Sequence, residues 1–202
     1  MATLVNLSER INLKDAVVLL LEPNDQGMEI LTHLMVGFGA RKLLKASRHQ
    51  QARAFTEKQP IDLVICEGIA PDGEPDGYDF VNWLRRSGLE PNAFCPVIMA
   101  SAHTSGPNVA RARDCGANFT VVKPLAPTVL LERILWVARE NRPFVTCTGY
   151  QGPDRRFKNE GPPPGSDGRR QTDLPGDLGE AMTPNLSQDE IDTVVRPQRM
   201  NL

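Results

Sequence analysis

Short apolar runs alternate with amphipathic stretches over the first 140 residues of the chain. Five of these runs are four to six residues long and are interrupted by few polar residues. Continuous apolar runs of this length are typical of strands that are buried on both faces of a parallel sheet. We therefore predict strands at residues 16–21, 43–46, 61–66, 96–100 and 119–122.

Apolar residues recur at helical spacing in the stretches that follow these runs. We predict helices at residues 24–36, 78–86, 108–115 and 128–139, and a further helix between Ser47, its expected N-cap, and Pro60. Five strand–helix units in succession predict an α/β fold with a doubly wound parallel sheet, right-handed crossovers and helices on both faces. In such a sheet, ligands bind at the carboxyl ends of the strands, near the point where the strand order reverses.

The last part of the chain differs in composition from the first 150 residues. Residues 151–202 contain one aromatic residue, Phe157, and seven of the 17 prolines, whereas both Trp and both Tyr precede them. A segment so poor in apolar surface cannot offset the entropy lost on ordering. We expect an N-terminal extension at 1–13, a folded domain at 14–143, a disordered Pro/Gly-rich linker at 144–185, a short helical motif at 186–196 and a C-terminal end at 197–202.

The distribution of charge excludes some classes of function. Residues 1–150 carry 16 Lys/Arg and 16 Asp/Glu, and residues 151–202 carry 7 and 9, so neither part is strongly basic. Nucleic-acid binding is disfavoured, because affinity for the phosphate backbone needs concentrated Lys and Arg. The chain has no run of 18 apolar residues and no signal-peptide pattern at its N-terminus, so we expect a cytoplasmic protein without a membrane partner.

Four cysteines, Cys66, Cys95, Cys115 and Cys147, are spaced too widely to form Cys-x-x-Cys pairs, and only three His residues accompany them. This spacing favours no metal site. We expect reduced thiols that fill space in the fold, which is the common role of Cys in the cytosol.

Polar residues follow four of the predicted strands and should meet at the carboxyl edge of the sheet. They are Glu22 with Pro23 after the first strand, Glu67 after the third, Ser101 after the fourth, and Lys123 with Pro124 after the fifth. In one interpretation these are ordinary strand ends, at which Lys123 neutralises Glu22 and Glu67 in a structural cluster. In the other interpretation two carboxylates, a hydroxyl and an ammonium form a functional site.

Four segments around these residues resemble the receiver domain of two-component response regulators, over roughly residues 14–141. The segments are VVLLLEPND, DLVICE, PVIMASA and GANFTVVKPL. The resemblance implies a flavodoxin-like receiver fold, a five-stranded parallel sheet of order 2-1-3-4-5. It implies that an acidic pair at positions 22 and 23 holds Mg²⁺, that position 67 accepts a phosphoryl group from a histidine kinase, and that Ser101 and Lys123 hold the phosphate. It also implies a cis peptide between Lys123 and Pro124.

The chain departs from the family pattern at three positions that carry the chemistry. Glu67 stands at the phosphoacceptor position, Pro23 stands at the second position of the acidic pair, and Thr120 stands where an aromatic switch residue is common. Mg²⁺ needs near-ideal oxygen ligation, so the affinity for Mg²⁺ should be low. Phosphoryl transfer depends on positioning, so transfer to Glu67 should be slow. We therefore expect an atypical receiver, a pseudo-receiver that is not an enzyme, that binds Mg²⁺ weakly or not at all, and in which Glu67 supplies fixed negative charge near Ser101 and Lys123.

Two alternatives stay open at this point. A carboxylate in the loop after the third strand, such as Asp72 or Asp76, could accept the phosphoryl group in place of Glu67. A small flavodoxin-like enzyme is the second alternative, since fold alone does not determine function. Its candidate base is His103, two residues after Ser101, and we expect that residue to be an exposed loop residue.

The C-terminal part contains one motif, LSQDEIDTVV at residues 186–195. Ser187 and Glu190 form a capping box, and three apolar residues follow it at helical spacing, Ile191, Val194 and Val195. With Leu186, the stretch resembles the N-terminal peptide of the flagellar switch protein that binds the chemotaxis response regulator, which reads Leu-Ser-Gln-x-Glu-Ile-Asp. The resemblance implies docking on the receiver face formed by the fourth helix, fifth strand and fifth helix, in cis or in trans. A chance capping box is the alternative.

We expect the partners to be receiver-like or chemotaxis and flagellar signalling proteins, a histidine kinase, or a second copy bound through the face between the fourth and fifth helices. The arginine pairs Arg155–Arg156 and Arg169–Arg170 could bind a phosphate group, but neighbouring carboxylates favour a solvated charge pattern.

Overall fold

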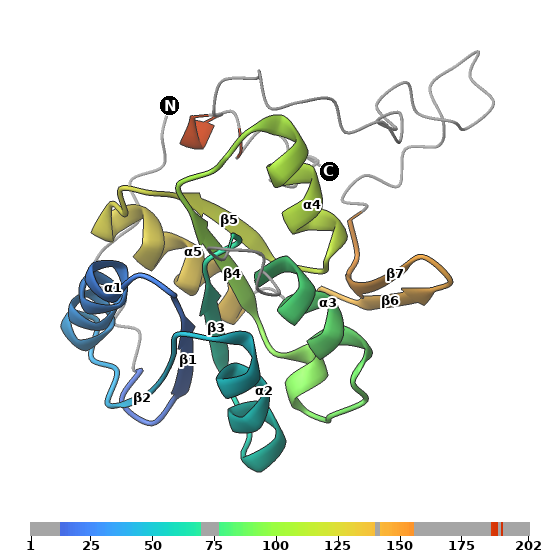
Figure 1. Cartoon of the computed structure of the whole chain (residues 1–202), viewed down its shortest axis with the longest axis horizontal. Helices are drawn as coiled ribbons and strands as arrows, with labels where there is room; N and C mark the ends of the chain where they lie inside the picture. Colours follow the sequence, from blue (N-terminus) through green and yellow to red (C-terminus); the bar gives the residue numbers. More distant parts are fainter. Residues whose placement is uncertain (1–12, 70–76, 140–141, 156–186, 190, 192–202) are drawn as a thin grey trace.

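The computed structural model describes residues 13–69, 77–139, 142–155, 187–189 and 191 (Figure 1). Five parallel strands form one sheet in the order β2-β1-β3-β4-β5. They are β1 (Val17–Leu21), β2 (Lys42–Ala46), β3 (Leu63–Cys66), β4 (Val97–Ser101) and β5 (Phe119–Val122). The predicted α/β class, the five strands and their order are thereby confirmed.

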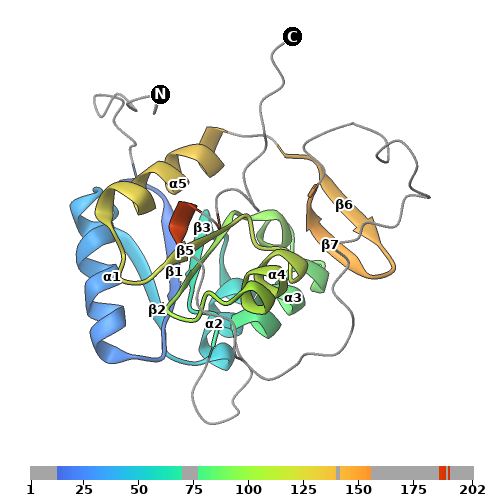
Figure 2. The same ribbon diagram turned by 90° about the horizontal axis from the view of Figure 1, so that it is seen from above.

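Within the described residues, five α-helices and one short 3-10 helix accompany the strands. They are α1 (Asp25–Gly37), α2 (His49–Lys58), α3 (Gly77–Arg86), η2 (Asn92–Phe94), α4 (Gly106–Asp114) and α5 (Pro127–Arg139). Figure 2 shows α1 and α5 on one face of the sheet and α2, α3 and α4 on the other. The sheet is thus the middle of three layers, as the doubly wound pattern predicts.

Alternate residues of each strand enter two separate apolar clusters, one on each face of the sheet. On β1, Leu19 and Leu21 join the cluster with α2, α3 and α4, whereas Val18 and Leu20 join the cluster with α1 and α5. All four side chains are buried. Because both faces are covered, the strands read as continuous apolar runs rather than as alternating ones.

One predicted helix start is wrong. The residue before α2 is Arg48, and no side chain caps the helix. Ser47 instead donates from its backbone N–H, at 3.0 Å, and from its hydroxyl, at 3.3 Å, to the side-chain oxygen of Gln51. The N-cap position is one residue later than expected and has no side-chain cap hydrogen bond, so Ser47 does not act as the N-cap.

The expected boundary at residue 143 is also wrong. Residues 144–153 form an antiparallel hairpin of β6 (Phe144–Cys147) and β7 (Tyr150–Pro153), beside α3 and α4 in Figure 1. Two rings, Phe94 and Phe144, meet edge to face at 5.1 Å, and the buried Tyr150 hydroxyl donates to the carbonyl of Pro153 at 2.6 Å. The expected linker therefore begins later, and residues 156–185 of it lie outside the described residues.

A buried arginine ties together the loops beneath this hairpin. Arg85, at the end of α3, donates to the carbonyls of Ala93, Cys95 and Gly116 at 2.7–3.0 Å. Burial lowers the pKa of Arg85, although neighbouring Cys and Tyr groups act in the opposite direction. Gly116 has φ of +98°, and a side chain there would meet the Gln151 carbonyl at 2.8 Å, so the hairpin backbone lies directly against this glycine.

The cysteines are free thiols, of which Cys66, Cys95 and Cys115 are buried and Cys147 is exposed on the hairpin. The expectation that all four fill space is therefore wrong for Cys147. Over the described ranges of the chain, no helix is both long and apolar enough to cross a bilayer. Within those same ranges, no group of three or more His, Cys, Asp or Glu residues is arranged to hold a metal ion.

Candidate functional site

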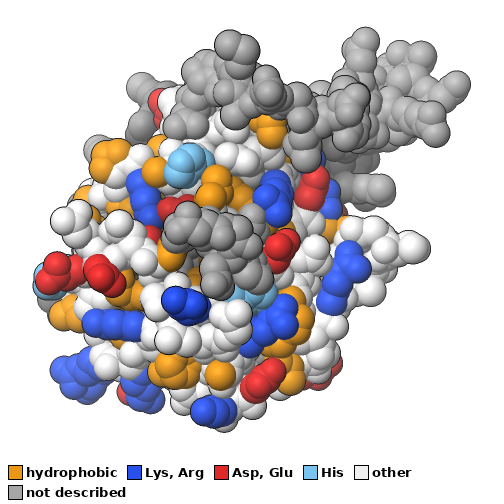
Figure 3. Space-filling view, viewed as in Figure 1, with side chains coloured by type: hydrophobic (Ala, Val, Ile, Leu, Met, Phe, Trp, Pro, Cys, Tyr) orange, Lys and Arg blue, Asp and Glu red, His pale blue; other side chains and the backbone are white. Residues whose placement is uncertain are grey.

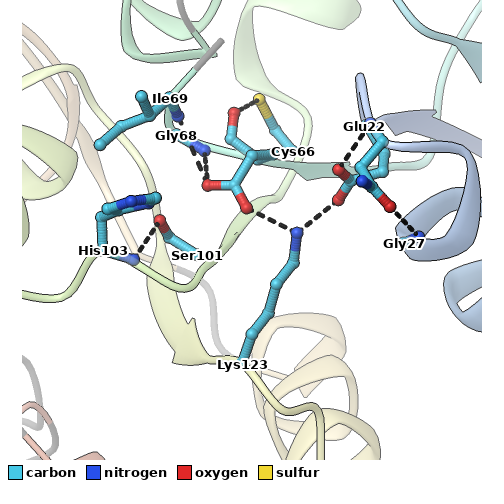
Figure 4. A network of polar contacts seen from close by, with 10 residues as sticks. Glu22, Gly27, Cys66, Gly68, Ile69, Ser101, His103 and Lys123 are labelled. Carbon is cyan, nitrogen blue, oxygen red and sulfur yellow. Dashed lines mark hydrogen bonds and ion pairs between the residues drawn. The ribbon is translucent and has the colours of Figure 1, made fainter. Parts of the chain in front are cut away.

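Three of the predicted site residues meet at the carboxyl edge of the sheet (Figure 4). The Lys123 ammonium lies 2.5 Å from a carboxylate oxygen of Glu22 and 2.5 Å from a carboxylate oxygen of Glu67. Glu22 is 2% exposed and Glu67 is 8% exposed. The strands β1, β3 and β5 run parallel and end at the same edge. Lys123 therefore contacts Glu22 and Glu67 directly, although they precede it by 101 and 56 positions in the sequence.

Glu22 is held beneath the first turn of α1. Its second carboxylate oxygen accepts from the backbone N–H of Asn24 at 3.1 Å, and the Asn24 side chain in turn caps α1 by accepting from the Gly27 N–H at 2.9 Å. A methyl group on Gly27 would lie 2.8 Å from the Glu22 carboxyl carbon. Pro23, next to Glu22, is partly buried and offers no side-chain oxygen. This corner of the site therefore supplies a single carboxylate.

Glu67 uses both of its carboxylate oxygens within the protein. One oxygen accepts from Lys123, and the other accepts from the backbone N–H groups of Gly68 at 2.7 Å and Ile69 at 3.4 Å. The second methylene of glutamate lets the carboxylate fold back over its own loop to reach these donors. Gly77 packs so closely above Glu67 that a methyl group there would lie 1.8 Å from the Glu67 carbonyl oxygen. The carboxylate is therefore fixed in place.

The electrostatics of the cluster favour a charged Lys123. Burial acts to lower the pKa of the ammonium, but the hydrogen bonds that it donates to Glu22 and Glu67 and the charges of both carboxylates outweigh burial, so the pKa of Lys123 is raised. The ammonium stands between the two carboxylates and partly neutralises both. Two acidic side chains can be buried at one strand edge only if a cation accompanies them.

Ser101, at the end of β4, lies beside this cluster in Figure 4, and Thr120 is a residue of β5. Ser101 is buried, its hydroxyl accepts from the His103 N–H at 3.1 Å, and its carbonyl accepts from the Lys123 N–H at 2.9 Å. Thr120 is buried as well. His103 is exposed. The Lys123–Pro124 peptide is cis, as is a second bond, Glu90–Pro91. Asp72 and Asp76 lie outside the described residues.

A short C-terminal segment lies against β5, where it is drawn in red in Figures 1 and 2. The side-chain amide of Gln188 accepts from the Val122 N–H at 3.0 Å and donates to the Thr120 carbonyl at 3.4 Å. Ile191 is 0% exposed, and its N–H donates to the Ser187 carbonyl at 3.0 Å, as in a helical turn. The side chains of Leu186, Glu190, Val194 and Val195 lie outside the described residues.

Gln188 belongs to the motif that resembles the flagellar switch peptide, but it was not predicted as a contact residue. The capping box and the apolar spacing pointed to other residues of the segment, Ile191 among them, whereas Gln188 contacts β5 through hydrogen bonds to the backbone. The available signal was its side-chain amide, which offers one acceptor and one donor group in the same way as a peptide unit.

One residue of the arginine pairs is described, and it has a structural contact. Arg155 lies 2.5 Å from the Asp114 carboxylate and stacks over the Tyr150 ring at 3.6 Å. It therefore joins the end of the β6–β7 hairpin to the end of α4. Arg156 and Arg169–Arg170 lie outside the described residues.

Comparison with known proteins places this geometry in a family. The sequence profile described as "Response regulator receiver domain" matches residues 18–135. Among curated proteins, none matches the chain. Chemotaxis protein CheY4 of Vibrio cholerae is similar at 24% identity, with a TM-score of 0.54, over 60% of this chain and 98% of that one.

Two further solved structures show the same likeness. A putative response regulator from Chloroflexus aurantiacus has 24% identity and a TM-score of 0.56, over 62% of this chain and 98% of its own. The receiver domain of a signal transduction histidine kinase from Syntrophus aciditrophicus has 24% identity and a TM-score of 0.53, over 66% and 98%. At these identities the likeness shows a shared fold, and the profile match over more than half of the chain shows the family. The chain belongs to the response regulator receiver domains.

Proposed function

We propose that this receiver signals through protein–protein contact without accepting a phosphoryl group, with Glu67 in place of the phosphorylatable Asp. The observation that carries the proposal is the arrangement of Glu22, Glu67 and Lys123, in which the ammonium lies 2.5 Å from both carboxylates. It is therefore a pseudo-receiver of a two-component or chemotaxis-type pathway.

The geometry of Glu67 disfavours attack on a phosphodonor. One of its carboxylate oxygens accepts from Lys123 and the other accepts from two backbone N–H groups. Attack would require Glu67 to give up one of these sets of hydrogen bonds and to adopt a new position. Since positioning provides most of the catalysis of phosphoryl transfer, the fixed carboxylate is a poor acceptor.

The residues present do not fit the Mg²⁺ that receiver chemistry implies. Mg²⁺ requires octahedral ligation by oxygens at about 2.0–2.1 Å. Pro23 offers no side-chain oxygen, and the Lys123 ammonium already contacts one oxygen of Glu22 and one of Glu67. A cation placed between these carboxylates would have to displace the ammonium. We expect Mg²⁺ binding to be weak or absent.

We propose that Lys123 pairs permanently with the Glu67 carboxylate instead of transiently with a phosphoryl group. The receiver resemblance assigns this lysine to the phosphate, and here Glu67 supplies the negative charge that keeps the ammonium in place. The domain therefore holds one signalling state, and regulation comes from the proteins that contact it. Expected partners are other receiver-like or chemotaxis and flagellar signalling proteins, a histidine kinase, or a second copy bound through α4, β5 and α5.

The tail is the second part of the proposed function. We infer that the segment around residues 186–196 docks on a receiver surface, in cis or in trans. The contacts of Gln188 with β5 and the burial of Ile191 support this inference. They lie on β5, which is one element of the face that the resemblance to the flagellar switch peptide implies.

Intact-mass spectrometry after incubation with acetyl phosphate and Mg²⁺ tests the absence of phosphorylation. A receiver domain with an Asp acceptor, treated in parallel, confirms that the phosphodonor is active. We expect no phosphoryl adduct on this protein under conditions that modify the control. A stoichiometric adduct mapped to Glu67 would show that the carboxylate is a working acceptor, whereas an adduct at Asp72 or Asp76 would favour phosphorylation at the neighbouring loop.

The enzyme alternative gains no support from the described residues. His103 approaches Ser101 through its backbone N–H rather than through its ring. The imidazole is therefore not placed there as a base for the serine hydroxyl.

A further inference from the structure

The two edges of the sheet are protected in different ways. A strand at the edge of a sheet presents unpaired N–H and C=O groups, which can pair with another chain. At one edge, β2 and the residue before it carry exposed cations, Arg41, Lys42 and Lys45. Lys and Arg side chains also gather over β2 and α2, at the lower left of Figure 3. Charge of this kind disfavours the approach of another strand.

The opposite edge, formed by β5, has no such charge. Its sequence is Phe119-Thr120-Val121-Val122, and among the described strands it pairs with β4 alone. The outward groups of this edge are instead paired by Gln188. The Gln188 amide accepts from the N–H of Val122 and donates to the carbonyl of Thr120, two residues earlier. A neighbouring strand would use its peptide groups to make the same kind of donor and acceptor pair.

The contact also has an apolar part. Ile191 lies three residues after Gln188, and its helical hydrogen bond to Ser187 places both side chains on one side of the turn. Ile191 is 0% exposed, so the apolar side chain is fully covered. The Gln188 amide thus fixes the position of the segment on the strand edge by hydrogen bonds, and the Ile191 side chain stabilises the contact by burial of apolar surface.

We propose that the outer edge of β5, from Thr120 to Val122, is a binding site for a short helical segment that carries a side-chain amide and, three residues later, an aliphatic side chain. Residues 187–191 of the same chain are its resident occupant, and a partner protein gains this edge only by displacing them. This inference rests on the proposed docking of the tail and selects the cis arrangement.

The length of the connection favours the cis arrangement. Residues 156–186 join the described hairpin end at Arg155 to Ser187, which is 31 residues. A tether of this size keeps its end at an effective concentration on the order of 1 mM near its site. A separate peptide at micromolar concentration therefore competes at a disadvantage of about 100- to 1000-fold. A displacing partner must contribute contacts beyond those of an equivalent short segment.

A competition experiment on the full-length chain tests this inference. A fluorescent peptide of residues 184–198 is titrated with wild-type protein and with Ile191→Asp, in which the chain's own segment is expected to leave the edge. We expect the peptide to bind Ile191→Asp at least about 30-fold more tightly than wild type, in line with the tether advantage. A Gln50→Ala protein, altered at an exposed glutamine of α2, should match wild type.

The outcomes separate this inference from the proposed function. Equal, measurable affinity for wild type and Ile191→Asp would overturn resident occupancy and leave docking in trans. No binding to either protein would overturn tail docking altogether. Hydrogen exchange at the Val122 amide gives a second readout, since this N–H donates to Gln188. We expect Gln188→Ala to accelerate it at least tenfold and Gln50→Ala to leave it unchanged. Unchanged exchange in Gln188→Ala would overturn the pairing.

Discussion

Replacing Lys123 by methionine should remove the cation that lets two carboxylates be buried together. The Glu22 and Glu67 side chains are 1% and 9% exposed, and both contact the ammonium. Removing one partner of a buried ion pair costs about 3–5 kcal/mol, because the other charge is left uncompensated. The Lys123 side chain is itself 20% exposed, so water can reach the site and the cost should lie at the lower end, near 3 kcal/mol.

Urea denaturation at neutral pH measures this change in the free energy of unfolding. Lys45→Met, at an exposed position of β2, is the matched control and should change stability by about 0.5 kcal/mol or less. Adding Glu67→Gln to Lys123→Met should recover part of the loss, since it removes one uncompensated charge, although Glu67→Gln alone should destabilise. If Lys123→Met lost no more stability than Lys45→Met, the ammonium would not be what allows these carboxylates to be buried.

Three further predictions concern packing and pH. Gly27→Ala should destabilise by about 1–3 kcal/mol because its methyl group would press on the Glu22 carboxyl; Gly37→Ala, in the same helix with open space around it, should be neutral or stabilising by calorimetry. Arg85→Met should cost about 3 kcal/mol or more in urea, since three buried carbonyls lose their donor. Burial, and then the charge of a neighbouring arginine, lowers the pKa of His49. The unfolded chain therefore binds more protons than the folded one, and the free energy of unfolding should fall as the pH drops below about 6.5. In His49→Gln, the dependence of stability on pH should be flatter in this range.

Each of these has a contradicting result. Equal loss in Gly27→Ala and Gly37→Ala would mean that contact with Glu22 is not the cause. A fully stable Arg85→Met would mean that the carbonyls find other donors. An unchanged pH profile in His49→Gln would show that another group is responsible for the acid dependence.

Periodicity was sufficient to predict the strands of a parallel sheet because both faces of the sheet are covered, as on β1. The strand order followed from the resemblance to receiver domains. The same reasoning could not find the β6–β7 hairpin. Its strands have no strong apolar pattern. The hairpin is held by a close backbone approach at Gly116, by the ring contact of Phe144 with Phe94, and by the ion pair of Arg155 with Asp114. Such contacts depend on parts of the chain that are distant in sequence and leave no periodic signal.

In the candidate site, too, some features could be predicted from the sequence and others could not. Placing Glu22, Glu67 and Lys123 at one strand edge follows from topology, because parallel strands end together. The fold-back of Glu67 onto the N–H of Gly68 depends on side-chain conformation and could not be predicted. Sequence reasoning expected the charge of Glu67 near Ser101 and Lys123, and the structure pairs Glu67 with Lys123 and with its own loop. Gln188 stands in the quoted motif, but its role could not be predicted because its partners are backbone groups, which sequence patterns do not reveal.

The claim that an ammonium occupies the place of a metal in this receiver is most directly tested by a Mg²⁺ titration followed by NMR. The backbone amides of Gly68 and Ile69 donate to Glu67, so their resonances report any change at that carboxylate. We expect no site-specific shift of these resonances in wild type up to millimolar Mg²⁺. Saturable shifts of both amides at sub-millimolar Mg²⁺ would contradict it, because they would show that a divalent cation displaces Lys123.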